Sequence, residues 1–335
     1  MESVFESFSG VSQSEAERAS AKGCGSPCGE DPSIELGAAV LDMRGPPFRG
    51  FSLRLIICSI AAIPRRLAVQ PQFSGVHMRV ALFVPCYVDQ LRPQVGLATL
   101  DLLTAAGFEV DFQEEVVCCG QPFLTAGETK RAAALGARFV DAFQHVEAIV
   151  TPSGSCAATL RRHLESLVAA PAAASVAAKT FELCEFITKE ATCPPLSRPF
   201  PHRVGLHASC HGLRELGLGT PTETRAAPRI DPARELLSQI PELEITSLDR
   251  RDECCGFGGT FSVEEAAVST RMGLDRLEDH GRGGAEIVTS TDVSCLLHLE
   301  GLSRRQTLPF EIFHIAEILA ASALGRDLRA SAEPR

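Results

Sequence analysis

Eight of the thirteen cysteines occur in two copies of one pattern. In each copy a single cysteine precedes an adjacent pair, a glycine follows the pair directly, and another single cysteine comes later: Cys86, Cys118, Cys119 and Cys156, then Cys210, Cys254, Cys255 and Cys295. Thiolates gathered from three distant segments form a soft, electron-rich set of donors, which suits an iron–sulfur cluster or, less often, zinc. The pattern therefore predicts that these eight cysteines are metal ligands, four in each copy.

The segments that flank the cysteines are repeated as well. Val80-Ala-Leu-Phe-Val-Pro-Cys86 matches Val204-Gly-Leu-His-Ala-Ser-Cys210, and Glu147-Ala-Ile-Val-Thr-Pro152 matches Glu286-Ile-Val-Thr-Ser-Thr291. Each apolar run ends at or shortly before a predicted ligand, and short apolar runs are typical of buried parallel strands. We therefore interpret the chain as a duplication in which strands position the cysteines.

The repeat continues after the last cysteine of each copy. Phe181-Glu-Leu-Cys184 aligns with Phe310-Glu-Ile-Phe313, which places Cys184 opposite Phe313. A cysteine whose repeat partner is phenylalanine is predicted to be a small buried hydrophobic residue rather than a ligand. Cys193, which two prolines follow, is predicted to belong to a linker.

Helical patterns lie between the predicted strands. Residues 94–106 carry apolar side chains at helical spacing and stop at a glycine before the strand-like run 108–112. In the second copy Asp231, followed by proline, predicts the start of the corresponding helix. Further helices are predicted near 128–143 and 263–278. The fold class is therefore α/β, with two tandem, related strand–helix lobes and parallel sheets whose ligands lie at the carboxyl ends of the strands.

The predicted organisation has four parts. A poorly ordered N-terminal extension (1–77) is followed by the first cysteine-rich domain (78–195), the second cysteine-rich domain (196–325) and a short tail (326–335). The first 50 residues are rich in Ser, Gly, Glu and Pro, which is typical of a segment without a packed core. Met78 stands just before the first repeated strand, so an alternative is that translation starts there and the extension is misassigned.

The extension is predicted to contribute neither a membrane span nor ligands. Its apolar run, residues 51–63, is shorter than the roughly 20 residues that a bilayer-spanning helix needs. Cys24, Cys28 and Cys58 are therefore expected to be non-ligands. The alternative, a metal clip made by the first two of them, lacks a second pair of donors.

Composition places the chain among ordinary globular proteins. Its residues are 45% hydrophobic, its net charge is −10, and it has no Trp and a single Tyr. An acidic chain without a basic stripe or stacking aromatic residues is not expected to bind nucleic acid. An odd number of cysteines in a long chain without a legible signal peptide favours a reducing cytoplasm over disulfide-bonded secretion.

Two segments around the second set of ligands carry a family resemblance. Ser209-Cys210-His211-Gly-Leu-Arg214 and Asp252-Glu-Cys-Cys-Gly-Phe-Gly-Gly-Thr-Phe261, together with the paired cysteine pattern, resemble the cysteine-rich CCG-domain family. That family includes the heterodisulfide reductase B-type subunit, the carboxyl-terminal half of the glycolate oxidase iron–sulfur subunit, and the lactate utilization protein A group. The last group resembles this chain most, over about residues 78–324.

The resemblance implies a function and partners. It implies an iron–sulfur protein, with [4Fe–4S] clusters, that works with other iron–sulfur and lactate-utilization subunits in the oxidation of L-lactate to pyruvate. It also implies a cytoplasmic location, with membrane contact made only through partners. No flavin or nicotinamide fingerprint and no acid–base set for a hydroxy acid is legible, so the chain is expected to be a redox subunit rather than a complete enzyme.

One departure from the family pattern bears on the chemistry. The pattern ends in C-x-x-C, whereas this chain has Ser153 and Asp292 three positions before the last cysteines. Each lobe thus offers four cysteines, enough for an ordinary [4Fe–4S] cluster but fewer than the double clusters of heterodisulfide reductases use. Direct disulfide cleavage is therefore less well supported.

Two alternatives to an electron-transfer protein stay open. The first is an assembly module with structural zinc, although short C-x₂₋₄-C knuckles are missing from the repeated region. The second is a dithiol or disulfide site made by a C-C-G pair alone. His211 lies beside a predicted ligand, but its repeat partner is Tyr87, which favours a packing or ligand-orienting role over metal binding.

Overall fold

The computed structural model describes residues 78–190, 193–225 and 227–328. All eight predicted ligands lie within these ranges. The predictions for the extension, including those for Cys24, Cys28, Cys58 and the apolar run 51–63, lie outside the described residues. Among the described residues, no helix is long and apolar enough to cross a bilayer.

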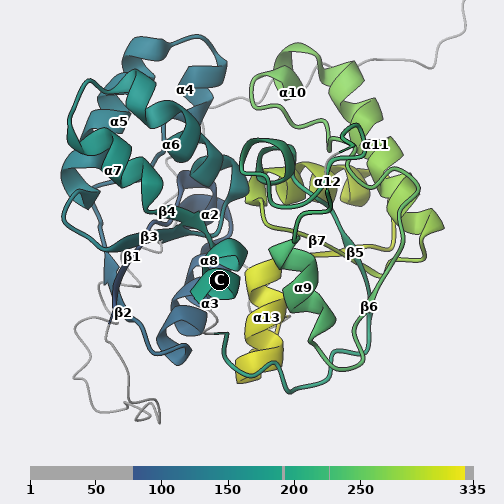
Figure 1. Ribbon diagram of the computed structural model, residues 1–335. Helices are drawn as coiled ribbons and strands as arrows, with labels where there is room; N and C mark the ends of the chain where they lie inside the picture. Colours follow the sequence, from purple (N-terminus) through teal and green to yellow (C-terminus); the bar gives the residue numbers. More distant parts are fainter. Residues whose placement is uncertain (1–77, 191–192, 226, 329–335) are drawn as a thin grey trace, which may run out of the picture. The chain divides into compact units, whose positions relative to one another are not determined.

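The first lobe is a parallel sheet with helices on both faces (Figure 1). Its four strands run in the order β2-β1-β3-β4 and pair in parallel throughout. In chain order its elements are β1 (Arg79–Leu82), α2 (Cys86–Leu91), α3 (Pro93–Ala105), β2 (Glu109–Phe112), α4 (Gln121–Thr125), α5 (Thr129–Phe143), β3 (Ala148–Thr151), α6 (Gly154–Leu167), α7 (Ala172–Ala178), β4 (Thr180–Glu182) and α8 (Leu183–Glu190).

The second lobe repeats this topology. Its four strands run in the order β6-β5-β7-β8, again all parallel. Its elements are β5 (Arg203–Leu206), the π-helix η1 (His211–Glu215), α9 (Pro232–Ser238), β6 (Glu244–Ile245), α10 (Phe261–Glu264), α11 (Ala266–Arg282), β7 (Ile287–Ser290), α12 (Val293–Arg305), β8 (Glu311–His314) and α13 (Ile315–Leu324). The prediction of an α/β fold with two related parallel-sheet lobes is confirmed.

Local sequence signals explain where the helices begin and end. Pro93 is the first residue of α3, and Gly107 follows the helix with a φ of 93°, a conformation that glycine adopts without strain. Asp231 caps α9 because its carboxylate accepts a hydrogen bond from the Arg234 amide. The helices predicted near 94–106 and 128–143 are therefore present with boundaries shifted by a residue or two.

The strand register corrects one repeat alignment. Phe181 pairs with Val150 of β3, and Phe313 pairs with the equivalent position of β7, Thr289. Phe181 therefore corresponds to Phe313, and the prediction that Cys184 lies opposite Phe313 is wrong by three residues, since the similar Phe-Glu dipeptides suggested a false register. Cys184 instead corresponds to Ala316, a small side chain that is also fully buried.

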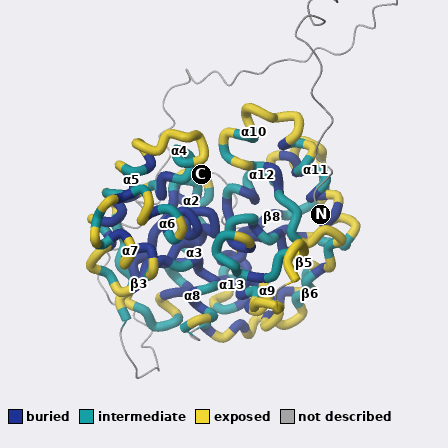
Figure 2. Tube along the Cα trace, turned by 45° about the horizontal axis from the view of Figure 1, so that its top comes forward, coloured by how far each residue is buried: buried dark blue, intermediate teal, exposed yellow. Residues whose placement is uncertain are grey.

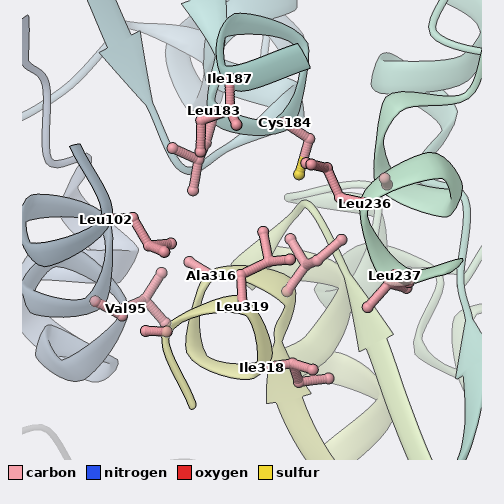
Figure 3. Close-up of a cluster of buried hydrophobic side chains, with 14 of the residues drawn as sticks. Val95, Leu102, Leu183, Cys184, Ile187, Leu236, Leu237, Ala316, Ile318 and Leu319 are labelled. Atoms are coloured by element: carbon pink, nitrogen blue, oxygen red, sulfur yellow. The ribbon is translucent and has the colours of Figure 1, made fainter. Parts of the chain in front are cut away.

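The two lobes share one hydrophobic core. Side chains of α3 and α8 from the first lobe pack with side chains of α9 and α13 from the second, as Figure 3 shows for Leu102, Leu183, Leu236 and Leu319. Cys184 lies in this cluster, as expected of a packing residue. Separate apolar clusters fill the opposite faces of the two sheets, under α5 to α7 and under α11 and α12.

Burial follows this layered arrangement. Every residue of β3 and β7 is buried, whereas the chain around α10 is exposed (Figure 2). A strand that is covered on both faces is mostly apolar, which explains the apolar runs in the sequence, although β7 ends in the buried polar residues Thr289 and Ser290. The rigid ends of these strands are the places from which the cysteine loops depart.

Candidate metal centres

The four cysteines of the first lobe form one set of contacting thiols. Cys86 is the first residue of α2, just after β1, and Cys156 lies in the first turn of α6, just after β3. The Sγ atoms of Cys119 and Cys156 are 3.2 Å apart, and the Cys118 thiol hydrogen-bonds those of Cys86 and Cys119. Three segments thus converge at the carboxyl ends of neighbouring parallel strands, where ligand sites of such sheets form.

The second lobe builds the same set from Cys210, Cys254, Cys255 and Cys295. The Cys254 thiol hydrogen-bonds those of Cys210 and Cys255, and the Cys255 thiol also reaches that of Cys295. Cys255 and Cys295 are buried, while the other two are partly exposed. The structure therefore brings together, within each lobe, the four cysteines that the sequence pattern grouped.

The glycine after each cysteine pair has a structural role. Gly120 and Gly256 both have a φ of 88°, and their amides donate hydrogen bonds to the sulfurs of Cys118 and Cys254 at 3.4 and 3.3 Å. A side chain at either position meets a helix backbone, because an added Cβ lies 3.3 Å from the Ala132 carbonyl oxygen or 2.5 Å from that of Ser269. Only glycine lets the loop turn this tightly beneath the sulfurs.

Hydrogen bonding among the thiols favours one thiolate in each set. Bonds from Cys119 and Cys86 lower the pKa of Cys118 to about 3, and bonds from Cys210 and Cys255 lower the pKa of Cys254 to about 2. The same contacts raise the pKa of Cys86, which acts as a donor in them. Each set therefore combines negative charge with soft donors, and this chemistry fits a thiophilic metal or an iron–sulfur cluster.

The two sets of thiols are linked across the lobes by neighbouring side chains. Gln121, next to Gly120, lies 3.0 Å from the His211 ring nitrogen, and the rings of Tyr87 and Phe257 meet edge to face with centroids 6.0 Å apart. His211 thus hydrogen-bonds a neighbour, in line with the positioning role expected for it. The residues around the two candidate centres are in direct contact.

Sequence reasoning missed one residue of the second centre. His207 is buried, and a ring nitrogen of His207 and the sulfurs of Cys255 and Cys295 all lie within 4.8 Å of one another, close enough to hold a metal ion. The signal was in the repeat alignment, where this histidine stands opposite Phe83. A polar residue at a buried strand position whose partner is apolar marks a difference between the two centres.

Comparison with known proteins agrees with this geometry. The cysteine-rich domain family, CCG, matches residues 80–161 and 204–300. The chain is 37% identical over 246 residues to lactate utilization protein A of Bacillus pumilus, which covers 72% of this chain and 99% of that protein. The figures are the same for lactate utilization protein A of Bacillus subtilis. The chain belongs to the lactate utilization protein A family of CCG-domain proteins.

Likeness to solved structures is weak. Glutamate racemase RacE1 from Bacillus anthracis matches with a TM-score of 0.30 and 12% identity, over 73% of this chain and 80% of that one. A score this low supports no inference about fold or activity.

The two departures from the family's C-x-x-C pattern are helix caps. The Ser153 hydroxyl accepts a hydrogen bond from the Cys156 amide at the start of α6, and the Asp292 carboxylate accepts one from the Ser294 amide at the start of α12. Asp292 also accepts from the Ser155 amide across the lobes, at 2.6 Å. These two residues cap the helices that carry Cys156 and Cys295, so they help to orient the last cysteine of each set.

Proposed function

We propose that the chain is an iron–sulfur electron-transfer component of a multi-subunit oxidoreductase that oxidises L-lactate to pyruvate. The observation that carries the proposal is the convergence of four thiols in each lobe at the carboxyl ends of equivalent strands. In the proposal, Cys86, Cys118, Cys119 and Cys156 hold one iron–sulfur cluster, and Cys210, Cys254, Cys255 and Cys295 hold another.

A bound cluster supplies the ability to take up and release single electrons. The residues of the chain supply the surroundings. The glycine amides after the cysteine pairs donate hydrogen bonds to sulfur, which offsets part of the negative charge on the thiolates. Tyr87, Gln121, His211 and Phe257 join the surroundings of the two centres, which supports electron passage between the lobes.

Metal analysis tests the cofactor assignment. After anaerobic purification we expect the full chain to contain iron and acid-labile sulfide, with little zinc. A structural-zinc site is the second candidate, because among the described residues His207, Cys255 and Cys295 lie close enough together to hold one metal ion. Zinc without iron or sulfide would favour that candidate and contradict the proposal.

A lactate assay tests the role in the complex. Oxidation of lactate releases two electrons and two protons, and the sequence carries no legible flavin or nicotinamide fingerprint, so in the proposal a partner subunit accepts them from the substrate. We expect no turnover by the isolated chain with an artificial acceptor, and turnover when co-expressed neighbouring subunits are added. Turnover by the chain alone, or undiminished turnover when only this chain is omitted, would contradict the proposed role.

A further inference from the structure

Beneath the thiols, the two lobes differ at three equivalent buried positions. In the first lobe Phe83 contacts Phe139 and Phe143 of α5, with ring centroids 5.1 and 6.1 Å apart. The glycines after the cysteine pairs touch Ala132 and Ser269, which fixes the alignment of α5 with α11. This alignment places Arg276 at the position of Phe139 and His280 at the position of Phe143, while His207 replaces Phe83.

The imidazole of His207 points toward the sulfurs without a polar partner. His207 is 1% exposed, and among the described residues neither of its ring nitrogens has a hydrogen-bond partner. A buried polar atom left without a hydrogen-bond partner carries a free-energy cost. Phe83 shows that an apolar ring fits the equivalent site, so packing alone does not explain the imidazole.

Binding to a metal would give a ring nitrogen of His207 the partner that it lacks. The ring nitrogen of His207 lies within 4.8 Å of the Cys255 and Cys295 sulfurs, and all three residues are buried. Imidazole nitrogen is a common ligand of iron and zinc beside thiolates. His280 of α11 lies next to the imidazole, with the two rings edge to face and their centroids 6.5 Å apart.

We propose that His207 is a nitrogen ligand of the metal group in the second lobe, which makes the two centres chemically unequal. The inference rests on the proposed function, since it assigns His207 to the cluster that Cys210, Cys254, Cys255 and Cys295 hold. The first centre has only sulfur donors. If the His207 imidazole binds iron in place of one of the four thiolates, the reduction potential of that centre is raised, so the second centre would have the higher potential of the two.

Pulsed electron paramagnetic resonance of the full chain tests this assignment directly. The protein is produced with natural-abundance or ¹⁵N-labelled histidine, loaded with iron and sulfide under anaerobic conditions, and reduced. We expect a nitrogen hyperfine coupling that changes with the isotope. The coupling is lost in His207→Phe and in His207→Asn, of which the second covers the case that the first does not fold.

A matched control and a second readout complete the experiment. His211→Gln changes a histidine next to a predicted ligand and is expected to retain the coupling, because the ring of His211 bonds Gln121 instead. In a potentiometric titration, His207→Phe lowers the midpoint potential of one centre and leaves the other unchanged.

The outcomes separate the inference from the proposed function. Iron and sulfide at the expected content, with no histidine coupling in the wild type or with a coupling that survives both His207 variants, overturn the inference alone. A chain that takes up no iron overturns the proposed function and, with it, the inference.

Discussion

The two lobes share topology, a set of four converging cysteines and a glycine turn, and they differ in the layer directly beneath the sulfurs. The first lobe has the phenylalanine cluster Phe83, Phe139 and Phe143, and the second has His207, Arg276 and His280 in the same places. All six side chains are almost fully buried. A duplicated fold thus keeps its ligand geometry while the surroundings of its two centres diverge.

The two layers contribute differently to the stability of their lobes. The phenylalanine rings stabilise their lobe by removing apolar surface from water, with additional edge-to-face contacts. The Arg276 guanidinium is fully buried and needs Asp279, itself buried, as its counterion. A buried ion pair gains little net stability compared with apolar packing. The polar layer is therefore better explained by a function near the second centre than by a contribution to stability.

The largest expected effect comes from removing a ligand in one lobe at a time. Cys118→Ser and Cys254→Ser each remove the thiol that contacts two others in its set. If each lobe holds its own cluster, we expect either variant to lose about half of the bound iron and the double variant nearly all of it. Iron and sulfide analysis measures this.

The control for the ligand variants is Cys193→Ser, which is expected to keep the full iron content. Cys193 packs at the edge of the shared core rather than among the thiols. Complete loss of iron from either single ligand variant would show that one centre spans both lobes, and the comparison between two separate centres would fail.

The second-largest effect tests the buried ion pair of the second lobe. Asp279→Asn leaves the Arg276 charge buried without its counterion, which is expected to cost about 3–5 kcal/mol in the free energy of unfolding. Denaturant unfolding under anaerobic conditions measures the change. Glu278→Gln is the matched control, because its ion pair with Arg282 is exposed to solvent and contributes little to stability. Equal effects of the two variants would contradict the assigned importance of burial.

The sequence was sufficient to predict the repeated framework. Apolar runs before Cys86 and Cys210, the proline and aspartate at the starts of helices, and the glycines after the cysteine pairs each have a local cause, so the lobes and the grouping of cysteines followed from them. The sequence could not predict which residues of the two lobes contact each other. The contact of Asp292 with the Ser155 amide depends on the packing of two helix ends that lie far apart in sequence.

The polar layer buried under the second centre could not be predicted from the sequence either. Arg276 and His280 belong to a helical stretch that reads as ordinary polar surface, and only the fold shows that both face the sheet. The error in the alignment of Phe181 has a related cause. Short strands allow several registers by sequence similarity alone, and the hydrogen-bonded pairing with β3 decides between them.

The third effect compares the two glycine turns. Gly120→Ala and Gly256→Ala both place a side chain at positive φ, which costs about 1–2 kcal/mol. The second change adds a clash, since its Cβ lies 2.5 Å from a carbonyl oxygen compared with 3.3 Å in the first lobe. We expect Gly256→Ala to destabilise more, and to lose iron from its lobe, in thermal unfolding and metal analysis. A larger loss for Gly120→Ala would contradict the tighter turn of the second lobe.

The smallest effect concerns the residues at the ends of β4 and β8, where an acidic side chain in one lobe corresponds to a basic side chain in the other. Glu182 and His314 occupy equivalent positions and cap the helices that follow, by accepting hydrogen bonds from the amides of Cys184 and Ala316. Burial raises the pKa of Glu182 to about 8 and lowers the pKa of His314 to about 4. Both groups are therefore held neutral in the folded chain around pH 6.

These shifts have opposite signs in the dependence of stability on pH. The contribution of neutral Glu182 to the free energy of unfolding is complete below the unfolded pKa of 4.5 and is lost as pH rises toward 8. The contribution of neutral His314 is complete above the unfolded pKa of 6.5 and is lost as pH falls toward 4.

Unfolding free energies of the cluster-loaded chain, measured between pH 5.5 and 8, test this difference. Glu182→Gln should remove part of the decline above pH 6, and His314→Asn part of the decline below it, each by on the order of 1 kcal/mol. Because glutamine and asparagine retain a capping oxygen, helix capping is preserved and only the titration is removed. If both variants flatten the same side of the profile, the two caps do not titrate as their burial requires, and the electrostatic difference between the lobes is limited to the layer beneath the sulfurs.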